Sequence, residues 1–318
     1  MAVLENARST SPEPGSDGDG KDGRITVQRE WIGAPAGTLT NPTCWLAVLV
    51  VGVLSGATWS YLAGNLSAWG AIALNALAMY IGFTVLHESM HGIAHSNRTV
   101  NAWLGRPMAL LLSVSAPMFR RVHFEHHSHT NDPQRDPDLF VSRGYKPLLP
   151  LWVFGVVFEY RRHYYGRKLW RSRAELAEAL GVELLLVALP VAALISGHFA
   201  EFIVVWAVPS ALAVMWLAIT FDYLPHYPFD SRERYYDTRV YPGRAGFVIL
   251  LGQNYHMIHH LWTTIPWYRL ATVFESIRPQ LEERGVRIGW RVERLPVRPT
   301  EEAHDAIAPR LQAGESAI

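Results

Sequence analysis

The chain has 318 residues, of which 49% are hydrophobic, and its 29 Lys and Arg nearly balance its 28 Asp and Glu. This balance excludes the strongly basic surface that is typical of nucleic-acid-binding proteins. The single cysteine, Cys44, excludes an intrachain disulfide and any cysteine-rich metal or iron–sulfur site.

The chain divides into three parts by composition. Residues 1–30 are polar and rich in Ser, Gly, Pro and Asp, and we predict a disordered N-terminal tail. Residues 31–288 are predicted to form one all-α integral membrane domain. Residues 289–318 are charged and interrupted by Pro, and we predict a C-terminal tail.

Two long stretches carry almost no charge. Residues 31–86 contain no Asp, Glu, Lys or Arg, and residues 184–221 contain only Glu201. A membrane-spanning helix needs about 20 mostly apolar residues, so each stretch is long enough for a helical hairpin. We predict four transmembrane helices, at about residues 42–63, 68–86, 180–196 and 200–221.

Shorter apolar runs at residues 108–119 and 147–158 are too short to span and are expected along the membrane interface or partway into the membrane. The segment 160–170, in which Arg and Lys alternate with Tyr160, Tyr164 and Tyr165, suits a belt at the level of the lipid headgroups, and a snorkelling basic helix is the favoured interpretation.

The positive charges predict the orientation. All 29 Lys and Arg lie in residues 1–41, 87–173 and 222–318, and the two hairpin tips carry none. Basic segments stay on the cytosolic side of a membrane. We therefore expect a bacterial-type inner-membrane protein with both termini in the cytosol and outward-facing hairpin tips.

Eight histidines form three clusters, each beside a long apolar stretch. They are His87 and His91; His123, His126 and His127; and His256, His259 and His260. Residues three and four apart lie on one face of a helix, so each cluster can direct its imidazoles to one point. His226, at the end of the predicted fourth span, is a ninth candidate ligand. All nine fall in segments that we predict to be cytosolic.

For His95 and His129 two interpretations remain: each is either an additional metal ligand or a residue that supports a ligand. His163, His198 and His304 stand alone and are expected to be non-ligands.

Metal-bound histidines usually donate the second ring N–H to a carboxylate or carbonyl. The acidic residues available for this role are Glu88, Glu125, Asp132, Asp136, Asp138 and Asp222. Asn254, two residues before His256, is a candidate for holding a metal-bound water.

Nine imidazoles exceed what one tetrahedral ion can use, so we predict two metal ions. The segment from His87 to His91 alone also matches the helix of a zinc metalloprotease, with Glu88 as the base, but that interpretation leaves the other clusters unused. Two irons with open positions for dioxygen fit oxidation of an unactivated C–H bond at a site that excludes water.

At these residues the chain resembles the membrane fatty acid desaturase/hydroxylase superfamily. Its signature is a first box with two histidines, then two His-x-x-His-His boxes, with an additional histidine before the last. The resemblance covers about residues 86–270 and implies a cytosolic helical cap that holds two irons as the catalytic centre. Their ligands would be His87, His91, His123, His126, His127, His226, His256, His259 and His260. Glu88 departs from the pattern, because the first box often has Asp there.

Within the superfamily, residues 121–138, 221–229, 239–242 and 251–269 resemble the desaturase-type β-carotene hydroxylases. The resemblance implies hydroxylation of β-carotene at ring carbon 3 to give zeaxanthin, with dioxygen as cosubstrate. Acyl-lipid desaturases and carotenoid ketolases share the boxes and remain alternatives. A metal carrier is disfavoured because the predicted spans have no charged lining.

The electrons for this reaction are expected from outside the chain, since no flavin, haem or iron–sulfur motif is recognisable. The expected partner is a ferredoxin-like donor with its reductase. Arg120, Arg121 and the basic segment 161–168 are the expected docking positions.

Overall fold

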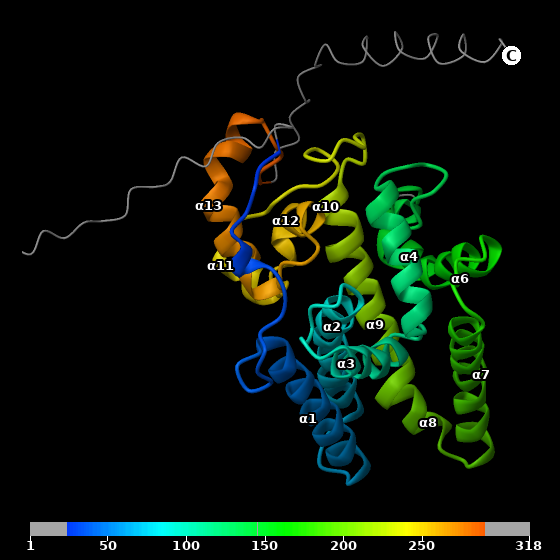
Figure 1. The fold of residues 1–318 in the computed structure, drawn as a ribbon. Helices are drawn as coiled ribbons and strands as arrows, with labels where there is room; N and C mark the ends of the chain where they lie inside the picture. Colours follow the sequence, from blue (N-terminus) through cyan, green and yellow to red (C-terminus); the bar gives the residue numbers. More distant parts are fainter. Residues whose placement is uncertain (1–23, 145, 290–318) are drawn as a thin grey trace, which may run out of the picture.

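The computed structural model describes residues 24–144 and 146–289, and this part of the chain is helical (Figure 1). The described residues form no β-sheet, and their one isolated bridge joins Val240 to Ile288. The predicted all-α class is confirmed.

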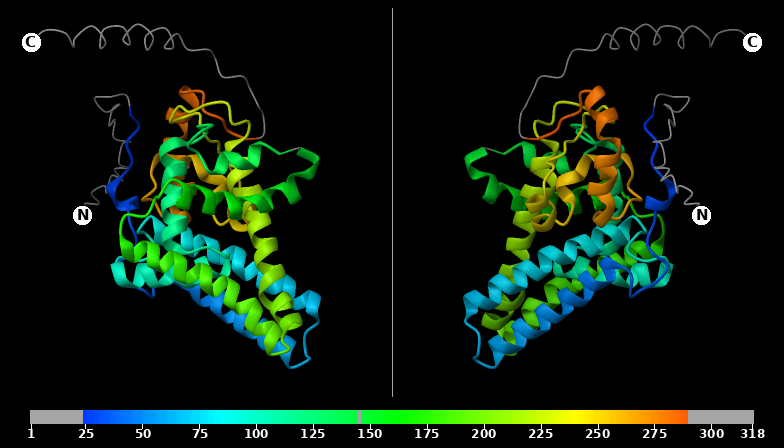
Figure 2. Two further views of the ribbon diagram at one scale, coloured as in Figure 1. Left: turned by 90° about the vertical axis from the view of Figure 1, so that its right-hand side faces the viewer. Right: turned by 90° about the vertical axis from the view of Figure 1, so that its left-hand side faces the viewer.

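Four helices are long and apolar enough to cross a membrane. They are α1 (Pro42–Leu62), α2 (Ala68–Met90), α7 (Arg173–Ile195) and a composite helix over Phe199–His226. Figures 1 and 2 show that these helices make up one half of the molecule, while the C-terminal helices lie in the other half. The four predicted spans are thus present as helices, and α2 continues beyond its predicted end through the first histidine box.

The composite helix is not regular along its length. It consists of α8 (Phe199–Phe202), the π-helix η5 (Ile203–Ala207), α9 (Val208–Leu217), the π-helix η6 (Ala218–Tyr223) and α10 (Leu224–His226). A π-helical turn accommodates extra residues and so rotates all that follow it about the helix axis. The second π segment therefore sets the direction of Phe221, Asp222 and His226.

Helix α7 is attached to the other helices largely by charge. It begins at Arg173, seven residues before the predicted span, and Ala179 is its only buried residue. Its glutamates pair with arginines on three other helices: Glu178 with Arg106, Glu175 with Arg121, and Glu183 with Arg161. Paired charges of this kind are how ionisable residues are tolerated next to a bilayer.

The remaining helices lie between and above the spans. Helix α3 (Arg98–Leu111) leads to α4 (Ala116–His129), and the 3-10 helices η2 (Asp138–Ser142), η3 (Lys146–Leu148) and η4 (Val153–Gly155), with α5 (Leu149–Trp152), lead to α6 (Val156–Gly166). The C-terminal part contains α11 (Arg244–Ile249), η7 (Gln253–Tyr255), α12 (His256–Leu261), η8 (Trp267–Arg269) and α13 (Leu270–Glu283).

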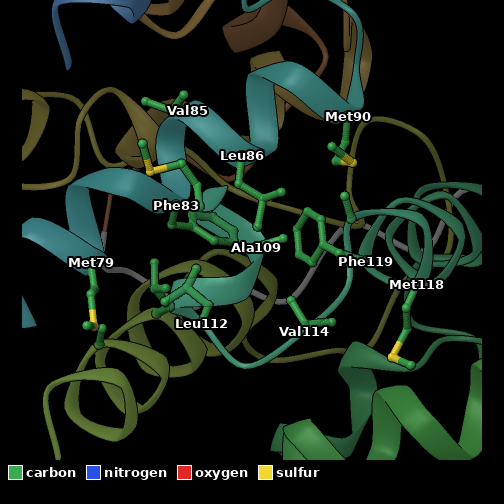
Figure 3. Packing of buried hydrophobic residues seen from close by; sticks show 14 of the residues in the cluster. Met79, Phe83, Val85, Leu86, Met90, Ala109, Leu112, Val114, Met118 and Phe119 are labelled. Carbon is green, nitrogen blue, oxygen red and sulfur yellow. The ribbon is translucent and has the colours of Figure 1, made fainter. Parts of the chain in front are cut away.

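The core lies where α2, α3 and α4 meet. Phe83 of α2 and Phe119 of α4 point toward one another between Leu86 and Leu112 (Figure 3), with their ring centroids 5.6 Å apart. The apolar run 108–119 supplies much of this core, because α3 ends and α4 begins within it. This run packs between helices, and its level relative to the membrane interface stays a prediction.

The segment 160–170 packs against the same core on one side. The Tyr164 side chain is fully buried there, and Arg161 is held by Glu183. Arg162, Arg167 and Lys168 are exposed, so the expected position at the lipid headgroups stays a prediction.

The structure also covers the end of the predicted N-terminal tail. Ile25 is buried against the core around α12 and α13, and η1 (Arg29–Trp31) follows it. The ordered domain thus begins before residue 31. The rest of that tail, residues 1–23, and the predicted C-terminal tail after Gly289 lie outside the described residues.

The predicted orientation can be tested with single cysteines, because Cys44 is the only one in the chain. In a Cys44→Ser background, Ser196→Cys at a hairpin tip should react with a membrane-impermeant maleimide in intact cells. Ser276→Cys on exposed α13 should react only after permeabilisation. The reverse pattern would contradict the orientation.

Candidate metal centre

The nine predicted ligands gather in two adjoining groups. In each group the ring nitrogens all lie within 4.8 Å of one another. The five-histidine group contains His87, His91, His123, His127 and His259, and the four-histidine group contains His126, His226, His256 and His260.

Each His-x-x-His-His box is divided between the groups. On α4, His123 and His127 are four residues apart and join the five-histidine group, whereas His126 joins the other. On α12 the assignment is reversed: His256 and His260 join the four-histidine group and His259 joins the five-histidine group. The expectation that each box directs its imidazoles to one point is therefore wrong for these two boxes. They link the two groups instead.

The nitrogen spacing within the groups suits a metal ion. In the five-histidine group, His123 Nε2 lies 2.9 Å from His91 Nε2 and 3.0 Å from His127 Nε2. In the four-histidine group, His256 Nε2 lies 3.1 Å from His226 Nε2 and 3.0 Å from His260 Nε2. Two nitrogens bound at right angles, each about 2.1 Å from an ion, would be about 3.0 Å apart.

Hydrogen bonds alone satisfy these rings poorly. The Nε2 of a neutral imidazole either donates or accepts a hydrogen bond. The Nε2 atoms of His123 and His256 each have two close Nε2 neighbours, and one hydrogen cannot form a full hydrogen bond with both. His87 is fully buried, and neither of its ring nitrogens has a hydrogen-bond partner among the described residues. Since buried polar atoms are normally paired, a cation in each group explains the arrangement. The donor set fits two metal ions.

The protonation of the imidazoles supports this interpretation. Burial lowers the pKa of His91 to about 3 and holds the pKa of His123, His127, His256, His259 and His260 well below the usual value. These rings are therefore neutral near pH 7, and neutral imidazole is the form that binds metals.

His126 is held differently from the other histidines. Its Nδ1 lies 2.9 Å from Asp136 Oδ1 and 3.4 Å from Asp138 Oδ2. Burial alone would lower the pKa of His126, but these two carboxylates outweigh it and raise the pKa to about 10, so a metal ion bound at Nε2 would have to displace a proton there. They orient Nδ1 toward themselves, so Nε2 faces the four-histidine group, 3.3 Å from His260 Nε2.

The other acidic candidates have other partners. Glu88 accepts the backbone N–H of Trp267 at 3.1 Å and so joins α2 to the C-terminal helices. Glu125 lies near His129 and Arg135, and Asp132 accepts backbone N–H groups of its own turn and pairs with Arg232.

Asn254 and two histidines also serve local structure. The Asn254 side-chain amide donates to Tyr241 O at 2.8 Å, which leaves its role toward a metal-bound water a prediction. His95 contacts Thr38 and accepts from the Asn97 backbone, and His129 contacts the Glu125 backbone. Neither His95 nor His129 is a member of the two groups.

An apolar pocket adjoins both groups. Its volume is about 600 Å³ including its open mouth, and its walls include Phe83, Phe119, Phe221, Leu112 and Leu217. Three phenyl rings of the wall pack on the imidazoles. Ring-centroid distances are 5.8 Å from Phe83 to His87, 5.2 Å from Phe119 to His123, and 4.7 Å from Phe221 to His256.

The pocket includes polar residues whose place the sequence did not indicate. Tyr160 and Asp222 line it beside His123. Asp222 was expected to support a ligand, and Tyr160 was expected near headgroups. The signal for Asp222 was its spacing of one helical turn before His226, but Tyr160 lies in a tyrosine-rich run that hides it.

Substitutions in the two groups should remove metal selectively. We expect His91→Ala and His226→Ala each to lose about half of the bound metal, since each removes a ligand of one ion only. Metal per chain is measured by inductively coupled plasma mass spectrometry on purified protein. His198→Ala, at an exposed hairpin tip, is the control and should keep all of it. Wild-type metal content in both ligand variants would contradict the assignment.

The Asp136 carboxylate should tighten metal binding through His126. Asp136→Asn keeps the shape but removes the charge, and we expect metal affinity to fall about tenfold or more in a chelator competition. The matched control is Asp132→Asn, a nearby carboxylate that contacts Arg232 and no imidazole of the groups. An equal loss in both variants would show a structural effect only.

Comparison with known proteins agrees with this site. The family model described as fatty acid desaturase matches residues 63–292. A beta-carotene 4-ketolase of Protosiphon botryoides is 26% identical over 66% of this chain and 53% of its own length, so the chain spans about half of that relative. A beta-carotene ketolase of a Paracoccus species is 29% identical over 66% of this chain and 88% of its own length.

A third relative acts on a lipid. The sn-1 oleoyl-lipid 12-desaturase of Arthrospira platensis is 23% identical over 72% of this chain and 74% of its own length. The matched region contains all nine grouped histidines and the apolar pocket. The chain therefore belongs to the fatty acid desaturase family.

Proposed function

We propose that this protein is a membrane oxygenase that converts a ring methylene of a carotenoid to a ketone, with two irons held by the nine grouped histidines. The observation that carries the proposal is the apolar pocket, whose phenyl rings touch imidazoles of both groups. Relatives that are named as carotene ketolases support the substrate and the product.

The irons, when bound, would supply the activation of dioxygen with electrons delivered from an external donor. The chain contributes a dry site and a fixed substrate position. Phe83, Phe119 and Phe221 present apolar faces to the substrate and exclude water next to the imidazoles.

The pocket suits part of a long apolar substrate. Ser113 and Arg161 are among its half-buried polar residues, and Arg161 is held by Glu183 and by the Ser113 carbonyl. A ring could be taken up while the rest of a polyene remains in lipid. Tyr160 and Asp222 lie near His123, where the reacting carbon would be placed.

Hydroxylation at ring carbon 3 is the second candidate. It is favoured by the flanking segments, such as residues 251–269, that resemble β-carotene hydroxylases. Both reactions begin with the oxygenation of a ring carbon, but ketone formation oxidises that carbon a second time. The reactions also differ in position, since the Protosiphon relative is named as a 4-ketolase and the hydroxylation is expected at carbon 3. Acyl-lipid desaturation, the activity in the name of the Arthrospira relative, needs a flexible acyl chain in the same pocket.

Product analysis tests the proposal. The chain is expressed in a host that accumulates β-carotene, and pigments are analysed by mass spectrometry, with His256→Ala as the control. We expect a product that gains one oxygen and loses two hydrogens per ring, and none in the control. Oxygen gained without loss of hydrogen would support hydroxylation. Unchanged carotene together with a new lipid double bond would replace the proposal by a desaturase.

A further inference from the structure

The pocket has a polar end close to the imidazoles. Tyr160 packs on Phe119 with ring centroids 6.1 Å apart, and Phe119 in turn stacks on His123. Asp222 follows Phe221, whose ring touches His87 and His256. Both polar side chains thus lie along the aromatic wall of the pocket and next to the reacting position.

The Tyr160 hydroxyl lies near Asp138, whose carboxylate is 3.4 Å from His126 Nδ1. Burial and the nearby carboxylates of Asp138 and Asp222 keep the pKa of Tyr160 well above its usual value, so the phenol stays protonated. A protonated phenol both donates and accepts hydrogen bonds, and Tyr160 lines the pocket.

Polar groups in an apolar pocket discriminate between successive forms of a substrate. A ring methylene neither donates nor accepts a hydrogen bond, whereas a ring alcohol does both. The Tyr160 phenol and the Asp222 carboxyl therefore favour the alcohol over the parent carotenoid. A ketone cannot donate, so it pairs with fewer of these groups than the alcohol does.

We propose that Tyr160, with Asp222 beside it, binds the ring alcohol formed by the first oxidation and holds it for a second oxidation at the same carbon. These residues would then decide whether the enzyme releases an alcohol or a ketone. The inference rests on the proposed function and names the intermediate that this site must recognise.

The chemistry balances with two turnovers. In the first, CH₂, O₂, two electrons and two protons give CHOH and water. In the second, CHOH, O₂, two electrons and two protons give C(OH)₂ and water, and C(OH)₂ loses water to form the ketone. A one-electron donor protein supplies the four electrons. The carbon must keep its remaining C–H bond toward the irons between turnovers, which a bound hydroxyl ensures.

The test is the product partition of Tyr160→Phe, which keeps the ring that packs on Phe119 and removes only the hydroxyl. We expect the ratio of ring alcohol to ketone to rise about tenfold, as for the loss of one hydrogen bond to a buried group. Tyr165→Phe is the matched control, because its hydroxyl lies on the same helix, has no hydrogen-bond partner among the described residues and does not line the pocket. Its ratio should match the wild type.

Metal per chain is measured in parallel. An unchanged ratio in a fully metallated Tyr160→Phe protein would overturn the inference. If that variant does not accumulate, wild-type membranes are given the ring alcohol and β-carotene in competition. Preferred oxidation of the alcohol supports the inference, and preferred oxidation of β-carotene overturns it.

The two proposals fail in different ways. A wild-type protein that forms no ring ketone, whether it leaves carotenoids unchanged or releases the alcohol, refutes the proposed function. A wild-type protein that forms the ketone, together with an unchanged alcohol-to-ketone ratio in Tyr160→Phe, leaves the proposed function standing and refutes the role of Tyr160.

Discussion

The structure depends on burying nine imidazoles in one place without leaving their nitrogens unsatisfied. Neutral rings such as His123 and His256 are tolerated inside a protein only if their lone pairs find partners, and here they mainly find one another. Two cations, one in each group, would resolve this, because each would draw several lone pairs to one point. The surrounding helices hold the imidazoles in place, because α2, α4 and α12 each end or begin at a histidine box.

Because α4 and α12 each contribute to both groups, the two metal positions are coupled mechanically. A shift of α4 would move His123 and His126 together and disturb both groups at once. The pocket wall shares these helices, since Phe119 precedes His123 by one turn. Substrate position and metal geometry are therefore set by the same backbone, which suits a reaction in which a C–H bond must be presented at a defined place.

The sequence predicts the helical class, the four long apolar helices and the nine histidines that gather, because composition and spacing depend on local chemistry. It does not predict which metal group each histidine joins. That division depends on how α4 and α12 cross, and on the π turn before His226, for which no residue pattern is diagnostic. Tyr160 was not predicted in the pocket for a related reason: a tyrosine beside arginines suits an interface equally well, and only the packing on Phe119 places it in the pocket.

The attachment of α7 has a consequence for how the protein responds to its surroundings. Three Glu–Arg pairs, such as Glu183 with Arg161, hold this helix, and apolar packing contributes little. Moving it sideways within a bilayer would replace protein contacts by lipid tails and would expose no apolar surface to water. The resistance to such movement comes from charge, for which anionic headgroups compete. The position of α7, and with it the Arg161 side of the pocket, thus depends on charge pairing, which an anionic lipid would weaken and a neutral lipid would leave intact.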